Sequence, residues 1–171
     1  MKKIILFLTI IITIFHPSFL SGHVKHYNNL KYLEYEIYLN NELIGTHAFN
    51  FEKDKNIISV KTNGKFKVKK LGIDLMNYST KTTETYVNGK LKNYISETFQ
   101  NDKRKYVILT FNKEKKHFEI DGSSFKGSTD ENSIVGSWWN HEIINKETQI
   151  SAVSGRILPQ KVKFLGKKEL I

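Results

Sequence analysis

The sequence contains no cysteine, so disulfides, cysteine-ligated metals and lipid attachment at an N-terminal cysteine are excluded. Arginine is scarce as well, because Arg104 and Arg156 are the only two among 27 basic residues. Recognition of base edges and phosphates usually depends on the planar fork of arginine. This shortage therefore argues against nucleic acid as a partner.

Catalytic motifs are also lacking. Residues 136–138, Gly-Ser-Trp, lack the closing glycine of the strained turn that carries the nucleophile in many serine hydrolases. His141 and Glu142 are not followed by the second histidine of a zinc-protease helix. His23 and His26 make only a weak metal pair, and no glycine-rich phosphate loop is present. The sequence predicts neither a metal nor a cofactor, and it leans away from an enzyme.

Residues 1–22 resemble a secretory signal peptide. Two lysines precede an apolar segment, residues 4–15, which is shorter than the roughly 20 residues of a membrane-spanning helix. Ser21 and Gly22 are small residues at the expected cleavage site. The sequence predicts export, to the periplasm of a Gram-negative cell or to the medium, with an uncleaved N-terminal membrane anchor as the alternative. Residues 23–31 predict a flexible lead-in.

The formal net charge is +10, and nearly all of the positive charge is lysine. A basic exported protein can bind the anionic surface of the cell envelope. A coding bias toward lysine, asparagine and isoleucine gives the same composition without any functional meaning. We prefer the second explanation and keep the envelope surface as a further partner.

Residues 32–171 show the alternation of apolar and polar side chains that predicts β-strands. Polar turn signals separate these segments, which indicates an antiparallel meander. The predicted fold is a single all-β domain that forms a curved half-barrel or barrel, with little helix after the signal peptide. The expected strands are 33–39, 44–51, 57–68, 75–87, 91–100, 105–112, 117–120, 149–153 and 157–165. The segment 123–133 predicts a polar loop, and 142–147 a helical turn.

Asn88-Gly89 is the strongest hairpin signal, because a type I′ turn needs positive φ at both central residues. Simple pairing across this turn puts Glu84 opposite Asn93. It also places Glu84 and Glu97 on one face if both point inward, which would suit acid–base chemistry. Farther upstream, Asn63-Gly64 predicts a bulge or kink within its strand.

Both tryptophans of the chain are adjacent, at Trp138 and Trp139, and are followed by Asn140 and His141. In an extended segment, neighbouring side chains point to opposite faces. One ring would then pack in the core, and the other would be exposed or line a cavity. A plug that closes the sheet is the preferred interpretation. The alternative is a lip over an apolar pocket, with Asn140 and His141 orienting a ligand.

Other candidate residues lie on the predicted strands. His47 shares a face with Phe49 and Phe51, which predicts that it points to the apolar side. Glu84 lies among tyrosines and threonines, where a carboxylate can bind a ligand, although a solvated glutamate on the outer face is the simpler interpretation. The candidate ligand-binding residues are His47, Glu84, Tyr86, Trp138, Trp139 and Asn140.

Several short patterns, in their order along the chain, resemble a family of exported bacterial proteins known as a domain of unknown function. The patterns are Ile-Gly-Thr-His at 44–47, Leu-Gly-Ile at 71–73, Glu-x-Tyr-x-Asn-Gly-x-Leu at 84–91, Ser-Trp-Trp-Asn at 137–140 and Thr-Gln at 148–149 before Gly155. The resemblance covers residues 35–165, with Tyr86 where the family tends to have tryptophan. It implies a curved antiparallel sheet in the periplasm, no known activity, and a chain truncated before the last family strands.

The sequence therefore predicts a non-enzymatic exported protein that binds an apolar or amphiphilic small molecule, such as a lipid, or a cell-envelope partner. One alternative is a hydrolase that uses His47, Glu84 or His141. The other is a purely structural or interaction module. The oligomeric state stays open.

Overall fold

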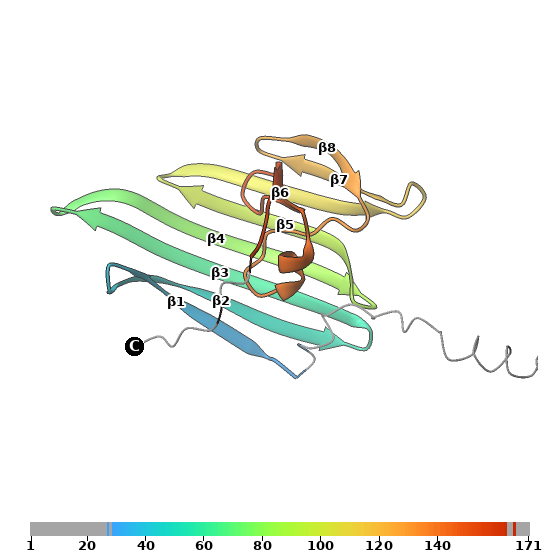
Figure 1. Ribbon diagram of the computed structural model, residues 1–171, viewed down its shortest axis with the longest axis horizontal. Helices are drawn as coiled ribbons and strands as arrows, with labels where there is room; N and C mark the ends of the chain where they lie inside the picture. Colours follow the sequence, from blue (N-terminus) through green and yellow to red (C-terminus); the bar gives the residue numbers. More distant parts are fainter. Residues whose placement is uncertain (1–26, 28, 164–165, 167–171) are drawn as a thin grey trace, which may run out of the picture.

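The computed structural model describes residue 27, residues 29–163 and residue 166. The predicted signal peptide, most of the lead-in and the predicted truncation point lie outside the described residues. Eight antiparallel strands form one sheet in the order of the sequence (Figure 1). They are β1 (Tyr32–Leu39), β2 (Glu42–Asp54), β3 (Ile57–Lys70), β4 (Ile73–Val87), β5 (Lys90–Gln100), β6 (Lys103–Asn112), β7 (His117–Gly122) and β8 (Lys126–Asp130).

Two-residue turns join most of these strands. Both central residues have positive φ in the turns Asn40-Asn41, Leu71-Gly72, Asn88-Gly89 and Asn101-Asp102. Such turns match the right-handed twist of the strands that they connect. The hairpin predicted at Asn88-Gly89 is confirmed, and asparagine, aspartate or glycine occupies every one of these positions except that of Leu71.

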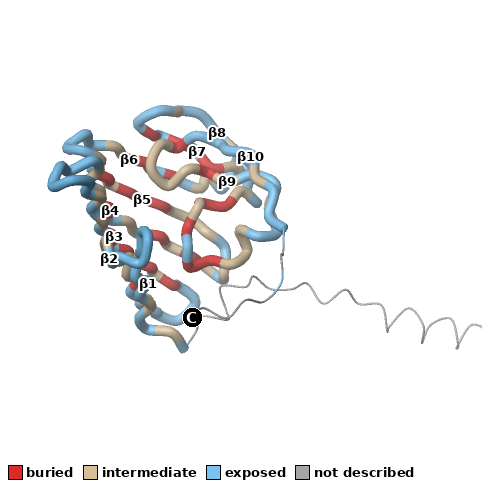
Figure 2. Tube along the Cα trace, turned by 60° about the vertical axis from the view of Figure 1, so that its left-hand side comes forward, coloured by how far each residue is buried: buried red, intermediate tan, exposed pale blue. Residues whose placement is uncertain are grey.

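The sheet is curved, and residues 131–159 cross its concave face (Figures 1 and 2). This covering segment contains η2, a 3-10 helix (His141–Asn145), and a short hairpin of β9 (Thr148–Ile150) and β10 (Ile157–Pro159). Alternate residues of the strands point into the space between sheet and segment. In β3, for example, Ile58, Val60 and Thr62 are buried. The all-β meander is confirmed, and the sheet is open rather than closed into a barrel.

Two groups of buried side chains form the core. One lies between β5, β6 and β7 and includes Tyr94, Leu109 and Phe118. Val135 and Ile150 of the covering segment complete it. The other gathers Phe49, Val60 and Tyr86 around Trp139. The covering segment thus contributes to both parts of the core and holds the concave face together.

The pairing of β4 with β5 differs from the prediction. Tyr86 pairs with Leu91, but Thr85 pairs with Asn93, so Lys92 is an extra residue in β5. This β-bulge shifts the register by one, and Glu84 therefore lies opposite Tyr94 rather than Asn93. The bulge predicted at Asn63-Gly64 is wrong, because β3 pairs without interruption through Gly64.

The segment 123–133 is not wholly a loop, because its residues 126–130 form β8. The strand pairs with β7 along its whole length, from Asp121–Lys126 to His117–Asp130. Its sequence, Lys-Gly-Ser-Thr-Asp, lacks the apolar alternation of a half-buried strand. Strand β8 therefore forms through backbone pairing with β7 at the edge of the sheet, and no pattern of buried side chains in its sequence indicates it.

Candidate functional site

A groove lies on the concave face, between the sheet and the covering segment. It consists of two hollows that share His47, Tyr78 and Trp138. The polar hollow has a volume of about 230 Å³ and lies beside the covering segment. The apolar hollow has a volume of about 600 Å³ and lies over β1, β2, β3 and the first half of β4.

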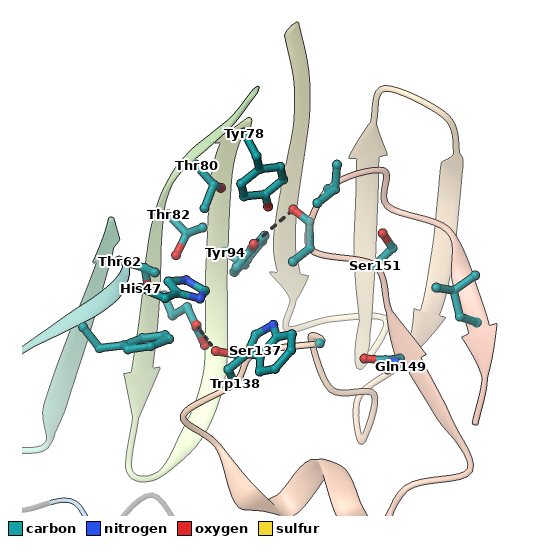
Figure 3. A pocket seen from close by; sticks show the side chains of 16 residues that line it. His47, Thr62, Tyr78, Thr80, Thr82, Tyr94, Ser137, Trp138, Gln149 and Ser151 are labelled. Carbon is teal, nitrogen blue, oxygen red and sulfur yellow. Dashed lines mark hydrogen bonds between the residues drawn. The ribbon is translucent and has the colours of Figure 1, made fainter. Parts of the chain in front are cut away.

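The polar hollow has more hydroxyl and amide side chains in its lining than the apolar hollow has, together with several apolar ones. Figure 3 shows threonines of the sheet on one side and residues of the covering segment on the other. The labelled polar side chains are His47, Thr62, Thr80, Thr82, Tyr78, Tyr94, Ser137, Gln149 and Ser151. Among the described residues, neither a lysine nor an arginine lines this hollow. Its walls can therefore donate and accept hydrogen bonds, but they carry no fixed positive charge.

Thr62 is the unusual member of this set. Its hydroxyl oxygen is buried and has no hydrogen-bond partner among the described residues. The neighbouring hydroxyls of Thr80 and Thr98, by contrast, lie 2.8 Å apart and bond to each other. A buried hydroxyl without a partner costs free energy, so Thr62 is a group that a ligand in the hollow could satisfy.

Aromatic and aliphatic side chains dominate the apolar hollow. Tyr35 and Ile37 come from β1, Phe66 from β3 and Tyr78 from β4. The rings of Phe66 and Tyr78 stack with their centres 4.7 Å apart. These residues could contact an aliphatic chain or a flat apolar group.

The two tryptophans point in opposite directions, as predicted for an extended segment. The side chain of Trp139 is 2% exposed and packs against Tyr27, Phe51 and Tyr86. Trp138 is 79% exposed and lines both hollows. Trp139 is therefore a core residue, whereas Trp138 overhangs the groove.

Glu84 fixes the covering segment to the sheet. Its side chain is 1% exposed, on the concave face of β4, so the simpler prediction of a solvated glutamate is wrong. One carboxylate oxygen accepts hydrogen bonds from the Ser137 hydroxyl (2.8 Å) and the Trp139 indole N–H (2.9 Å). The other accepts one from the Tyr86 hydroxyl (2.6 Å).

Burial dominates the electrostatics around this carboxylate. It raises the pKa of Glu84, and the three donors oppose that shift because they stabilise the ionised form. Burial also raises the pKa of Tyr86 well above its usual range, with a further contribution from the charge of Glu84. Tyr86 therefore stays protonated and donates to Glu84.

Asn140 is also buried, and it is used by the fold. Its side-chain oxygen accepts from the backbone N–H of Glu142 (3.1 Å) and caps η2. The Asn140 side chain also hydrogen-bonds the Tyr86 hydroxyl and opposes the rise in the pKa of Tyr86. Close by, the Tyr27 hydroxyl is hydrogen-bonded to Nδ1 of the His141 ring, at 2.7 Å. Of the residues predicted to orient a ligand, Asn140 and His141 therefore lie outside the lining of the groove.

His47 does point to the apolar side of the sheet, as predicted. Its ring lies 4.5 Å from that of Phe49 between ring centres, and it contributes to both hollows. Burial lowers the pKa of His47, so its ring is neutral and has one donor and one acceptor nitrogen. Gly64 leaves room for this ring, because a Cβ there would lie 3.0 Å from its Cδ2 atom.

Glu84 and Glu97 do not form a pair. Lys81, which pairs with Glu97, is exposed on the convex face, where Glu97 bonds Arg104 (2.5 Å). Leu91 packs against the core, whereas Glu97, six residues later in the same strand, lies on the opposite face. The bulge at Lys92 causes the difference, because an extra residue moves all later side chains of β5 to the other face.

Sequence reasoning identified His47, Glu84 and Trp138 at the groove, but it missed most of the lining. Thr62, Tyr35 and Phe66 gave no separate signal, because each is one of several similar residues in an alternating strand. Their common feature is that they follow the inward side of consecutive hairpins. Knowledge of the pairing register between neighbouring strands would have shown that these side chains lie on the same face of the sheet.

Two further properties hold for the described residues. No cluster of three or more histidine, aspartate or glutamate side chains is arranged to hold a metal ion in this part of the chain. No helix within the same residues has the length and apolar character needed to cross a membrane.

Comparison with known proteins gives one match. Residues 35–171 match the model of a family described as Domain of unknown function (DUF6134). No curated protein and no solved structure matches the chain.

Proposed function

The chain belongs to the DUF6134 family of domains of unknown function, and for this member we propose the binding of a small amphiphilic molecule in the concave groove. The observation that carries the proposal is that the two hollows adjoin, since both are lined by His47, Tyr78 and the exposed Trp138. The apolar hollow would take a chain or ring of the ligand, and the polar hollow its head group. Predicted export would place this binding outside the cytoplasm.

The chemistry of the polar hollow favours an uncharged head group. Its hydroxyl, amide and imidazole groups match alcohols and amides. The buried carboxylate of Glu84 lies at its wall without a lysine or arginine beside it in the lining. A carboxylate or phosphate head group would therefore find no positively charged partner among the described lining residues. A neutral head group with several hydroxyls fits best.

The other two interpretations have less support. A hydrolase would need Glu84 to act on a substrate, whereas Glu84 accepts hydrogen bonds from Ser137, Trp139 and Tyr86 that hold the fold together. A purely structural module would need no groove, yet the space under Trp138 is not filled by the side chains around it. Binding of an amphiphile, by contrast, gives a role to both the apolar and the polar walls of the groove.

A titration with dodecyl glucoside, below its critical micelle concentration, tests the proposal. We expect saturable binding that shifts the fluorescence of Trp138 to shorter wavelength, and weaker binding of dodecanoate. Thr62→Val should weaken dodecyl glucoside binding about three- to tenfold, the value of one hydrogen bond, without loss of stability. Thr83→Val, on the convex face of the same strand pair, is the matched control and should bind as the wild type does.

The adjacent tryptophans provide a second pair of variants. Trp138→Ala should abolish the fluorescence shift and weaken binding, with little change in stability because the side chain is exposed. Equal affinity of Trp138→Ala and wild type, measured by calorimetry, would contradict the proposal. So would tighter binding of dodecanoate than of dodecyl glucoside, since it would require a positive charge at the head group.

A further inference from the structure

The turn between β3 and β4 exposes an unusual set of apolar side chains. Leu71 is 94% exposed, Ile73 66% and Leu75 53%. Leu71 also has a φ of 50°, in the left-handed region that costs a leucine roughly 1–2 kcal/mol. In the other turns with positive φ at both central residues, asparagine, aspartate or glycine occupies these positions, and in the remaining turns of the sheet positive φ falls on the hydrophilic Lys55 and Lys116. Neither turn geometry nor core packing accounts for a leucine here.

Positive charge surrounds these apolar side chains. Residues 65–75 contain four lysines and a single acidic residue, Asp74. Asp74 is bound to Lys67 at 2.7 Å. Lys69 and Lys70, directly before Leu71, are exposed. The hairpin end therefore combines exposed apolar side chains at its tip with a group of lysines beside them, which we call the lysine collar (Lys65, Lys67, Lys69 and Lys70).

The same end of the sheet carries a second apolar turn. Tyr38, Leu39 and Leu43 flank the β1–β2 turn and are exposed. Figure 1 shows the β1–β2 and β3–β4 turns at one end of the molecule, with the β3–β4 hairpin extending farthest. The turns at the other end, Lys55-Asn56, Asn88-Gly89 and 113–116, are polar or charged. Ile57, beside the Lys55-Asn56 turn, is also exposed (41%), so exposed apolar side chains are concentrated at the end of the β1–β2 and β3–β4 turns rather than confined to it.

We propose that the β3–β4 hairpin tip docks onto an anionic phospholipid bilayer. Leu71, Ile73 and Leu75 would enter the boundary between head groups and acyl chains, where apolar side chains gain free energy. The lysines would remain among the anionic head groups and extend their apolar stems along them. A second copy of this chain is a poorer occupant, because it would bring two lysine collars together.

The docked tip would also bring the groove close to the bilayer. Phe66 and Tyr78, which line the apolar hollow, lie opposite each other on β3 and β4. Phe66 is five positions before Leu71, a distance of roughly 17 Å along an extended strand. An amphiphile could then pass between bilayer and groove. This last step rests on the proposed function, whereas docking of the tip does not.

The absence of cysteine allows a direct test. Leu71→Cys and, at the opposite end, Lys115→Cys each provide one attachment site for an environment-sensitive nitrobenzoxadiazole dye. Vesicles of phosphatidylcholine with phosphatidylglycerol should increase and blue-shift the emission at position 71 but not at position 115. Phosphatidylcholine vesicles alone should give a much smaller change. The dye reports its own position, so residues 1–22 do not confuse the result.

Variants without a dye then separate the contribution of the lysine charges to vesicle binding from that of the apolar side chains. Lys69→Gln and Lys70→Gln should each weaken vesicle binding about fivefold, and Lys113→Gln, on the far turn, should not. Leu71→Asn should weaken it about tenfold while its melting temperature is not lowered, because asparagine tolerates positive φ.

Three results would overturn the docking proposal. They are equal responses of both dyes, no response at position 71, and a response that depends on protein concentration without vesicles, which would indicate a second copy. The dodecyl glucoside titration uses no vesicles, so failure of docking and failure of groove binding are distinguishable.

Discussion

Glu84 is a buried carboxylate that accepts three hydrogen bonds, two of them from the covering segment. Its removal leaves three buried donors, of Ser137, Trp139 and Tyr86, without their acceptor. Glu84→Ala should therefore lower the free energy of unfolding by at least about 3 kcal/mol. Glu84→Gln keeps an acceptor and removes the charge, so its loss should stay within about 1.5 kcal/mol. Urea denaturation of both variants checks this, and equal losses would contradict it.

The pKa of Glu84 predicts a dependence on pH. Since burial raises it, the folded chain holds this proton more tightly than the unfolded chain does. The stability from this group is complete below about pH 4, the ordinary carboxyl range, and is lost as the pH rises through the raised pKa. The free energy of unfolding of the wild type should therefore fall relative to Glu84→Gln over this interval and then stay level. A free energy of unfolding of the wild type that rises with pH relative to that of Glu84→Gln would contradict this assignment.

Sequence reasoning found Glu84 unusual but could not place it. A glutamate between threonines fits a solvated face as well as a buried one, because alternation alone does not say which face is inward. The deciding partners, Ser137 and Trp139, are 53 and 55 residues away in the chain. Only the path of the covering segment brings them to β4.

At the scale of elements, contact between the covering segment and β7 depends on glycine. A Cβ at Gly122 would lie 2.6 Å from the backbone oxygen of Ser154 and 3.0 Å from the Cα atom of Gly155. The loop 151–155 is further held by Tyr94 and Ser96, which donate to the Ala152 carbonyl at 3.1 and 2.7 Å. Backbone atoms cannot move aside as a flexible side chain can, so this contact requires glycine.

Gly122→Ala should consequently lower the free energy of unfolding by about 1–3 kcal/mol. It should also speed hydrogen exchange at the Ser124 amide, which donates to the Ser154 carbonyl (3.1 Å). Gly127→Ala is the control, since the added Cβ would mainly meet the movable ring of Phe125. Equal losses from the two variants would show that the approach of the loop to Gly122 is not the cause.

The elements also show how far local signals reach. Asparagine and glycine in the turns predicted the hairpins, because positive φ is a local requirement. The bulge at Lys92 was not predictable, since it depends on how two strands fit together. The strand β8 was missed for a related reason, because its pairing partner rather than its composition determines it.

Considered as a whole, the molecule is a one-layer sheet that depends on its covering segment. Val135, Trp139 and Ile150 are among the most buried side chains, and all three come from that segment. The sheet alone would expose both core groups to water. One layer of strands cannot bury its apolar face without a second layer.

A chain that ends at Asp130 should therefore lose its cooperative unfolding transition. We expect weak near-ultraviolet circular dichroism and strong binding of anilinonaphthalene sulfonate, which indicate exposed apolar surface. The full-length chain under the same conditions is the control. A sharp thermal transition in the shortened chain would show that the eight strands are stable without their cover.

The order of the strands has a consequence for folding kinetics. Each strand pairs with its neighbour in the chain, so the hairpins can close in sequence over short loops, and such local closure is fast. Glu84, by contrast, must wait for Ser137 and Trp139, and it stays hydrated until they arrive. Closure of the concave face is then the late event. A chain that emerges from its N-terminal end first would acquire the groove only after the covering segment has appeared.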